Sequence, residues 1–328
     1  MVPHYAVKSN NDTHLLQWIQ HEGVRFDCAS PIEIRQALKT GALPSRIIYA
    51  NPCKSIEDIT TAKQLGISTT VVDSPEEVQK LLEAGFGEQV LIRLKVPDAA
   101  SAIPFSRKFG APIAWVPDIL HALRQAKIRH TGWSFHVGSL CGDPRQYRKA
   151  IEVCAEAAAI AGAHPETVDI GGGFMPETFA AAAAEIRPAM GLFPATTDWI
   201  AEPGRFLSSP VATLYVKVIG VKRGQEDGTK IYTIDDSVYG TFSNIPFDQQ
   251  KPVYRLTAPD AATRPRIQAT LFGRTCDSAD CLADNIELPE LHVGDVLEVQ
   301  NMGAYTNVSA SCFNGFPLAE RSYNFLSS

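Results

Sequence analysis

Side chains capable of chemistry stand at the ends of short apolar segments. They are Lys8, Asp27, His136, Glu202 and Arg205. A lysine amine partly withdrawn from water can act as a nucleophile, carboxylates and an imidazole can hold or transfer protons, and an arginine can bind an anionic group. Each residue alone also has a simple structural explanation, such as a strand-end lysine that reaches solvent, a packed strand histidine, or a Glu–Arg pair across a tight turn.

Three consecutive glycines, Gly171, Gly172 and Gly173, follow the apolar segment 167–170. Glycines there allow a backbone with exposed N–H groups to approach an anion closely, although a sharp strand exit with positive φ explains them equally well. Together these residues supply an amine, a loop suited to phosphate, a carboxylate for a ring nitrogen and a flat imidazole. These are the groups needed to hold pyridoxal phosphate.

Alternating strands and helices must position these residues. Strands are predicted at residues 4–8, 24–27, 46–50, 69–73, 90–95, 132–137, 167–170 and 198–202. Helices begin after the capping serines Ser30, Ser55 and Ser74, and a longer helix is predicted at residues 145–162. This count favours a closed (β/α)₈ TIM barrel over an open doubly wound sheet, which would carry a GxGxxG turn after its first strand. The candidate residues then share one end of the barrel, and the loops after strands 7 and 8 suit phosphate.

The pattern changes after Arg205. Strands with little helix between them are predicted at residues 211–222, 230–235, 253–257, 266–272 and 295–301. We therefore expect two domains, an α/β barrel over residues 1–205 and a C-terminal antiparallel β domain over residues 206–328.

Composition excludes several functional classes. The chain has 328 residues and a net charge of −6, so neither nucleic acid nor an anionic membrane is a favoured partner. The seven cysteines are odd in number and scattered, which indicates reduced thiols in a cytoplasmic protein. Cys276 and Cys281 lack the further ligands of a zinc site, so no metal is predicted. The sequence shows no signal peptide and no membrane-spanning segment.

A series of motifs in order along the chain points to one family. They are YAVK at 5–8, FDCAS at 26–30, IYANPCK at 48–54, KFG at 108–110, SFHVGS at 134–139, DIGGGF at 169–174, AEPGR at 201–205, TCD at 275–277, NMGAYT at 301–306 and FNGF at 313–316. Through them the sequence resembles the eukaryotic-type ornithine decarboxylases. These are basic amino-acid decarboxylases of fold-type III that depend on pyridoxal phosphate and have an alanine-racemase-like barrel.

The resemblance implies that the cofactor is pyridoxal 5'-phosphate and that Lys8 binds it as an internal aldimine. It places Asp27 beside this linkage, His136 against the cofactor ring and Glu202 at the pyridine nitrogen. It further implies that the phosphate is held by Ser139, Gly171, Gly172, Gly173, Arg205 and Tyr305.

The resemblance also implies roles for the β domain. Cys276 would protonate the carbanion left by decarboxylation, so that L-ornithine becomes putrescine, a step of polyamine biosynthesis. Asp248 and Asp277 would bind the distal amine, because a buried ammonium needs paired charge. In this family Cys276, Asp277 and Phe313 enter the active site of the other subunit, and Phe313 would contact the substrate there. A homodimer with shared active sites is therefore expected.

Departures from the family pattern bear on turnover. Pro104 stands where relatives carry an arginine, with Arg107 close by, while Arg274 replaces a proline and Leu140 replaces a glycine. Lys8 lies very near the start of this sequence, whereas relatives have a further segment before it that adds a strand to the β domain. We therefore expect an exposed strand edge or a weaker β domain.

Other functions remain open. Lysine differs from ornithine by one methylene, worth about 1–3 kcal/mol in a pocket, so a lysine or arginine decarboxylase is an alternative. Asp248 and Asp277 disfavour diaminopimelate because they would repel its distal carboxylate. Glu202 disfavours an alanine racemase, which has an arginine at the pyridine nitrogen. A non-catalytic homologue similar to antizyme inhibitor is the alternative outside enzymes, and the sequence does not indicate whether an antizyme-like regulator binds.

Overall fold

The chain forms two compact units, Met1–Leu207 and Ser208–Ser328. Their architecture comes from a computed structural model that describes residues 1–224, 226 and 228–324. The predicted boundary after Arg205 falls at the start of α8 (Arg205–Ser208), the short helix through which the chain leaves the first unit.

The first unit is a closed barrel of eight parallel strands, which confirms the predicted (β/α)₈ class. In barrel order the strands are β1 (Val2–Ala6), β10 (Asp198–Ala201), β9 (Thr167–Asp169), β7 (Arg129–Ser134), β5 (Gln89–Arg93), β4 (Thr69–Val72), β3 (Ile47–Tyr49) and β2 (Arg25–Cys28). One prediction was wrong in detail, because β1 ends at Ala6 and Lys8 lies in the following 3-10 turn Val7–Ser9. The turn carries Lys8 out of the strand and over the barrel mouth, the end where the strands finish.

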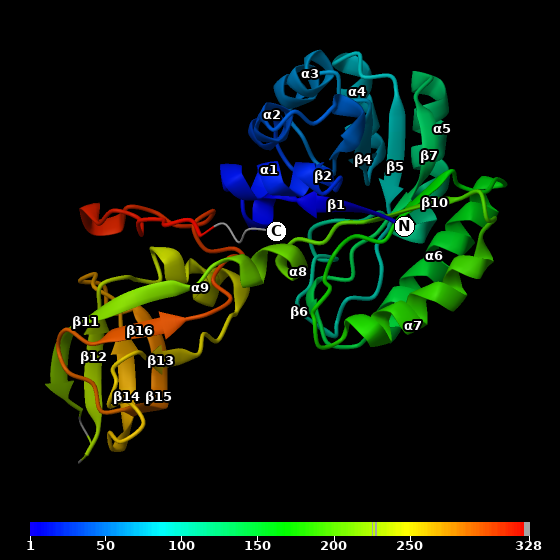
Figure 1. Cartoon of the computed structure of the whole chain (residues 1–328). Helices are drawn as coiled ribbons and strands as arrows, with labels where there is room; N and C mark the ends of the chain where they lie inside the picture. The colour runs from blue at the N-terminus through cyan, green and yellow to red at the C-terminus, as the bar shows by residue number, and fades with distance from the viewer. Residues whose placement is uncertain (225, 227, 325–328) are drawn as a thin grey trace. The chain divides into compact units, whose positions relative to one another are not determined.

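Helices surround these strands, as Figure 1 shows. They are α1 (Thr13–His21), α2 (Pro31–Lys39), α3 (Ile56–Gln64), α4 (Pro75–Glu83), α5 (Val116–Ala126), α6 (Arg145–Ala161) and α7 (Phe179–Ala189). The predicted capping serines are confirmed: Ser30, Ser55 and Ser74 accept N–H groups of the first turns at 3.3, 3.0 and 3.3 Å.

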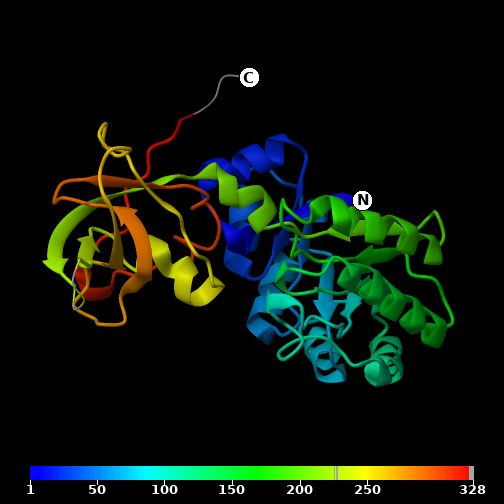
Figure 2. The same ribbon diagram turned by 90° about the horizontal axis from the view of Figure 1, so that it is seen from below.

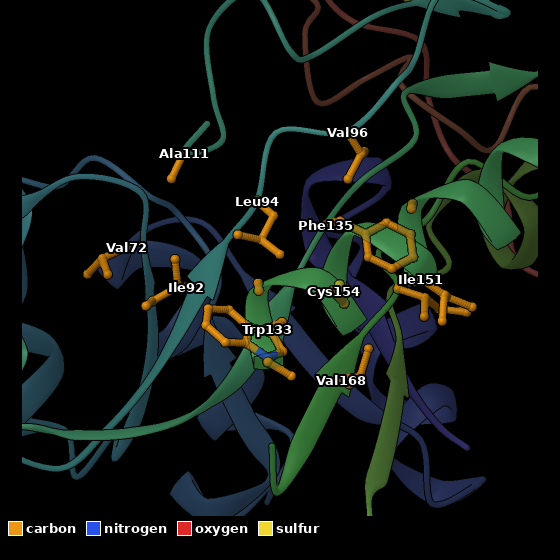
Figure 3. Packing of buried hydrophobic residues seen from close by; sticks show 14 of the residues in the cluster. Val72, Ile92, Leu94, Val96, Ala111, Trp133, Phe135, Ile151, Cys154 and Val168 are labelled. Atoms are coloured by element: carbon orange, nitrogen blue, oxygen red, sulfur yellow. The ribbon is translucent and has the colours of Figure 1, made fainter. Parts of the chain in front are cut away.

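Apolar side chains fill the space between strands and helices. Figure 3 shows Ile151 and Cys154 of α6 beside Phe135 and Val168 of the barrel wall, all fully buried in one cluster. Trp133 of β7 belongs to the same cluster. This packing fixes the strand ends on which the candidate residues stand.

The second unit is built on a six-stranded sheet that is curved in both Figure 1 and Figure 2. In sheet order its strands are β13 (Tyr254–Leu256), β16 (Val296–Val299), β11 (Leu214–Arg223), β12 (Lys230–Ile234), β14 (Arg266–Phe272) and β15 (Cys281–Pro289). The predicted antiparallel β domain is confirmed by four antiparallel strand pairs, and only β12 and β14 pair in parallel. A short helix, α9 (Asn244–Asp248), lies between β12 and β13 in the chain.

Three strands were not predicted from the sequence. β15 contains Asn285 with φ +50°, and the register with β14 shifts there, so the period of two is broken. β6 (Ser101–Ile103) and β8 (Ser139–Cys141) form a separate two-stranded ribbon in loops of the first unit.

Among the described residues, no helix is both long and apolar enough to cross a membrane. All seven cysteines are free thiols. Within the same residues, no three His, Cys, Asp or Glu side chains gather as a metal site would require.

Candidate active site

An ion pair between Lys8 and Asp27 lies at the barrel mouth. Nζ of Lys8 is 2.7 Å from Oδ2 of Asp27, which is fully buried on β2, whereas the lysine side chain is 41% exposed. Oδ1 of Asp27 is buried and accepts no hydrogen bond from any described residue. The pair therefore presents an amine that a ligand can reach and a carboxylate oxygen with spare acceptor capacity.

Two further carboxyl groups are buried beside this pair. Glu202 directly follows β10, and its Oε1 accepts no hydrogen bond within the described part of the chain. Asp169, at the end of β9, accepts from the Gly171 N–H at 2.9 Å and from Ser134 Oγ at 3.1 Å. Burial raises the pKa of Asp169 to about 6. Burial, together with Asp169 and Asp27, raises the pKa of Glu202 well above its ordinary value, so Glu202 holds a proton when no cation lies against it.

Arg93 is a site residue that the sequence reasoning missed. It ends β5, and burial lowers the pKa of its guanidinium while Glu202 and Asp169 raise it. Arg107, considered as a substitute for the family arginine, is exposed. The signal was available, because Arg93 is the last residue of a barrel strand, but this strand was predicted to extend to residue 95.

His136 presents a neutral ring. Its Nδ1 accepts the Gly138 N–H at 3.0 Å, and Phe105 lies edge-on to the ring at 4.7 Å. Burial, with the positive charges of Arg93 and Lys8, lowers the pKa of His136 well below its usual range. The imidazole therefore stays uncharged at neutral pH and can stack on a flat ligand.

The predicted glycine loop is a tight cradle. A Cβ on Gly172 would lie 2.6 Å from the Glu202 carbonyl oxygen, and Gly171 and Gly173 have φ of +63° and +91°. Tyr147 holds the loop by donating its hydroxyl to the Gly172 carbonyl at 2.9 Å. Only glycine fits these positions, so no side chain comes between the loop backbone and a ligand.

Arg205 and Ser139 also come together, with Nη2 of Arg205 donating to Oγ of Ser139 at 3.2 Å. Ser139 opens β8, and Arg205 opens α8. A guanidinium and a hydroxyl in contact are suited to an anionic oxygen.

A second group of predicted residues gathers in the second unit. Oδ1 of Asn314 accepts both the backbone N–H of Cys276, at 3.2 Å, and its thiol, at 3.4 Å. Asp277 accepts the Tyr239 hydroxyl, and the Tyr239 ring stacks on Phe313 at 4.3 Å. Tyr239 and the contact made by Asn314 were not predicted from the sequence.

Two other predicted residues belong to the second unit. Asp248 is 5% exposed at the end of α9. Tyr305 has φ +54°, a strained conformation for a bulky residue and one that clusters at functional sites. The roles of both residues toward the barrel remain predictions.

The first unit fits pyridoxal phosphate. The buried Oε1 of Glu202 lacks a partner among the described residues and suits a ring N–H, while the glycine cradle excludes any Cβ and suits a phosphate. The neutral face of His136 suits a flat ring, and the exposed part of Lys8 suits an aldehyde.

Comparison with known proteins agrees with this geometry. The family model "Pyridoxal-dependent decarboxylase, pyridoxal binding domain" matches residues 1–209. Antizyme inhibitor 2 of Xenopus laevis is 36% identical over 336 residues, covering 96% of this chain and 74% of that protein. An ornithine decarboxylase of Schizosaccharomyces pombe is 36% identical over 326 residues, covering 96% of this chain and 76% of that protein. The crystal structure of the Paramecium bursaria Chlorella virus arginine decarboxylase bound to agmatine superposes with a TM-score of 0.91 at 36% identity, covering 96% of this chain and 88% of that one.

Proposed function

Because this chain belongs to the pyridoxal-dependent decarboxylases, we propose that it converts L-ornithine to putrescine and carbon dioxide. The observation that carries the proposal is the Lys8–Asp27 ion pair, set in a barrel mouth beside a buried Glu202 oxygen without a described partner. That arrangement supplies an amine for an aldehyde and a carboxylate for a ring nitrogen.

Each part of the cofactor has a suited group in the first unit. Nζ of Lys8 would bind the aldehyde carbon, and Glu202 would hold the ring nitrogen. The glycine loop, Ser139 and Arg205 would bind the phosphate, with Tyr305 as a further proposed contact. When bound, the cofactor supplies an electron sink for the electron pair left by departing carbon dioxide.

The residues of the mouth control charge and protons. A bound ring N–H cation would favour the ionised form of Glu202, which in turn keeps that nitrogen protonated. Arg93 offsets the negative charge of the carboxyl groups that face it. His136 adds no charge to the ring face. Asp27 would hold the Lys8 ammonium after substrate has displaced the lysine, which keeps a proton donor in place.

Two acidic residues of the second unit support a basic substrate. The Tyr239 hydroxyl and the Ala279 N–H donate to Asp277 and lower the pKa of its carboxyl, so Asp277 is ionised at neutral pH. Asp248 is the second proposed contact for the distal amine. The similarity to the S. pombe ornithine decarboxylase favours ornithine as the substrate. The similarity to the viral arginine decarboxylase makes arginine the main alternative, and a similar lysine/ornithine decarboxylase structure from Vibrio vulnificus makes lysine a further one.

We propose a homodimer with shared sites. Cys276, Asp277 and Phe313 of one subunit would enter the site built on the partner's barrel, with Cys276 as the proton donor to the product carbon. The odd number of scattered cysteines supports a cytoplasmic location.

The proposal is tested by carbon dioxide release from ornithine, lysine, arginine and diaminopimelate by the purified protein with added pyridoxal phosphate. We expect kcat/KM to be highest for ornithine and release to be abolished in Lys8→Ala. If kcat/KM is highest for arginine or lysine, the proposed substrate is wrong and that amino acid replaces it. Cofactor binding without release from any of the four would contradict the proposed activity.

A second candidate function rests on the similarity to antizyme inhibitor 2. A non-catalytic homologue would bind a regulatory partner without turnover. The Lys8–Asp27 pair and the glycine cradle favour the enzyme, because a protein that binds no cofactor needs neither. Absorption spectra with added pyridoxal phosphate separate the two, since the enzyme gains a visible band and the regulator gains none.

A further inference from the structure

The 3-10 turn η7 (Phe313–Gly315) is held from two sides within the second unit. On one side the Tyr239 ring stacks on Phe313 at 4.3 Å, and the Tyr239 carbonyl accepts the Ser311 N–H at 2.7 Å. On the other side Nη2 of Arg274 donates to the Pro317 carbonyl at 2.6 Å, and its guanidinium lies 4.5 Å from the centre of the Phe316 ring. The turn is therefore anchored before and after Asn314.

Asn314 links this anchored turn to Cys276. Its Oδ1 accepts from both the backbone N–H and the thiol of Cys276, at 3.2 and 3.4 Å. One oxygen that binds the main chain and the side chain of the same residue fixes the χ1 rotamer of that residue. Asn314 has φ +56°, a conformation that asparagine tolerates better than most residues.

Arg274 is one of the departures from the pattern of the family that the sequence resembles, in which a proline stands at this position. A proline has no side-chain donor, so it could make neither of the two contacts with Phe316 and Pro317. Arg274, two residues before Cys276, therefore clamps the segment that follows Asn314.

We propose that Asn314, clamped through Arg274, is the positioning residue that sets the Cys276 thiol for proton delivery. This inference rests on the proposed function. The Oδ1 acceptor holds the S–H and keeps the sulfur in one place. Rotation about the Cβ–Sγ bond then turns the S–H toward the product carbon, which takes the proton and becomes a C–H. Cys276 is left as a thiolate and regains a proton from water.

The first test needs no cofactor. Alkylation of Cys276 by iodoacetamide in the apo-protein is followed by peptide mass spectrometry, so that other cysteines do not interfere. Asn314→Gly removes the acceptor and keeps the positive φ available, and we expect alkylation about fivefold faster than in the wild type. Asn285→Gly is the matched control, because Asn285 is an exposed asparagine with φ +50° in the same unit. An unchanged rate in Asn314→Gly overturns the inference.

The second test is the ratio of amine to carbon dioxide formed. A proton that reaches the product carbon gives the amine, whereas one that reaches the cofactor carbon gives an aldehyde and pyridoxamine phosphate after water has cleaved the remaining C=N bond. We expect a ratio near one for the wild type and Asn285→Gly, and a fall of about twofold or more for Asn314→Gly and Cys276→Ala. Asn314→Asp keeps an acceptor oxygen and should stay close to the wild type, while Arg274→Met should shift toward Asn314→Gly with KM unchanged.

The outcomes separate this inference from the proposed function. A wild type that releases no carbon dioxide overturns both. A wild type that turns over, with a ratio lowered by Cys276→Ala but not by Asn314→Gly, overturns the positioning role alone.

Discussion

Three buried carboxyl groups, Glu202, Asp169 and Asp27, share the barrel mouth with two cations, Arg93 and Lys8. If all were ionised, the mouth would carry one excess negative charge in a poorly solvated place. The raised pKa of Glu202 removes that charge by keeping a proton. A ligand that brings a cationic ring N–H neutralises the same excess negative charge. A buried carboxyl group that otherwise holds a proton is therefore suited to this cofactor.

A charge prediction follows for Glu202→Gln. In the folded apo-protein the pKa of Glu202 lies above that of the unfolded chain, so the folded state holds an extra proton and loses stability as pH rises through that window. Glutamine has no proton to hold. We expect apo Glu202→Gln to melt a few degrees above the wild type at pH 8, with a smaller gain at pH 5.

The control for this measurement is Glu156→Gln, an exposed change on α6 that should move neither melting temperature. Calorimetry of both apo-variants measures these melting temperatures at the two pH values. A Glu202→Gln protein that is less stable than the wild type at both pH values would show that Glu202 is ionised and well paired.

The positions of candidate residues were predictable where a side chain stands in a motif, and unpredictable where several distant strands bring side chains together. Lys8, Glu202 and the glycines follow from the positions of strand ends. Arg93 and Asp169 act through charge in a shared mouth, which depends on strands distant in the sequence. No local pattern in the sequence indicates that these side chains come together.

At the scale of elements, the glycine loop after β9 is the part of the barrel that we propose to bind the cofactor phosphate. Gly172 does not require positive φ, so Gly172→Ala tests space alone: its Cβ would lie 2.6 Å from the Glu202 carbonyl and 3.2 Å from His136 Nε2. Such overpacking costs about 1–3 kcal/mol, so we expect the Kd for pyridoxal phosphate to rise about tenfold or more. Fluorescence titration measures it.

Gly191→Ala is the matched change for Gly172→Ala, since nothing lies within 4 Å of a Cβ at Gly191. Its Kd should equal that of the wild type. Equal affinity in Gly172→Ala as well would mean that this loop does not bind the cofactor.

The elements themselves were largely predictable from the sequence. Most residues of the eight barrel strands are buried, and capping serines begin α2, α3 and α4, so local signals agree with the fold. β15 was missed because acidic residues and the strained Asn285 interrupt its alternation. Lys8 was assigned to a strand because the sequence does not indicate that β1 gives way to a 3-10 turn after Ala6.

At the scale of the whole molecule, the proposed site draws on two units. Lys8 belongs to the first unit, and Cys276 belongs to the second. If a site takes its barrel from one subunit and its thiol from the partner, a mixed dimer of Lys8→Ala and Cys276→Ala subunits contains one intact site.

Co-expression of these two variants in equal amounts tests shared sites. Random pairing makes half of the dimers mixed, each with one intact site of two, so we expect about a quarter of wild-type putrescine formation. Each variant expressed alone should form little. A mixture no more active than the two variants measured separately would place the whole site within one chain.

The most direct test of the central claim is reductive trapping of the cofactor. The wild-type protein is incubated with pyridoxal phosphate, reduced with borohydride and mapped by peptide mass spectrometry. The account predicts one modified lysine, Lys8, and no modification in Lys8→Ala. Cofactor trapped instead at another lysine, such as the buried Lys54, or no cofactor trapped at all, would contradict it.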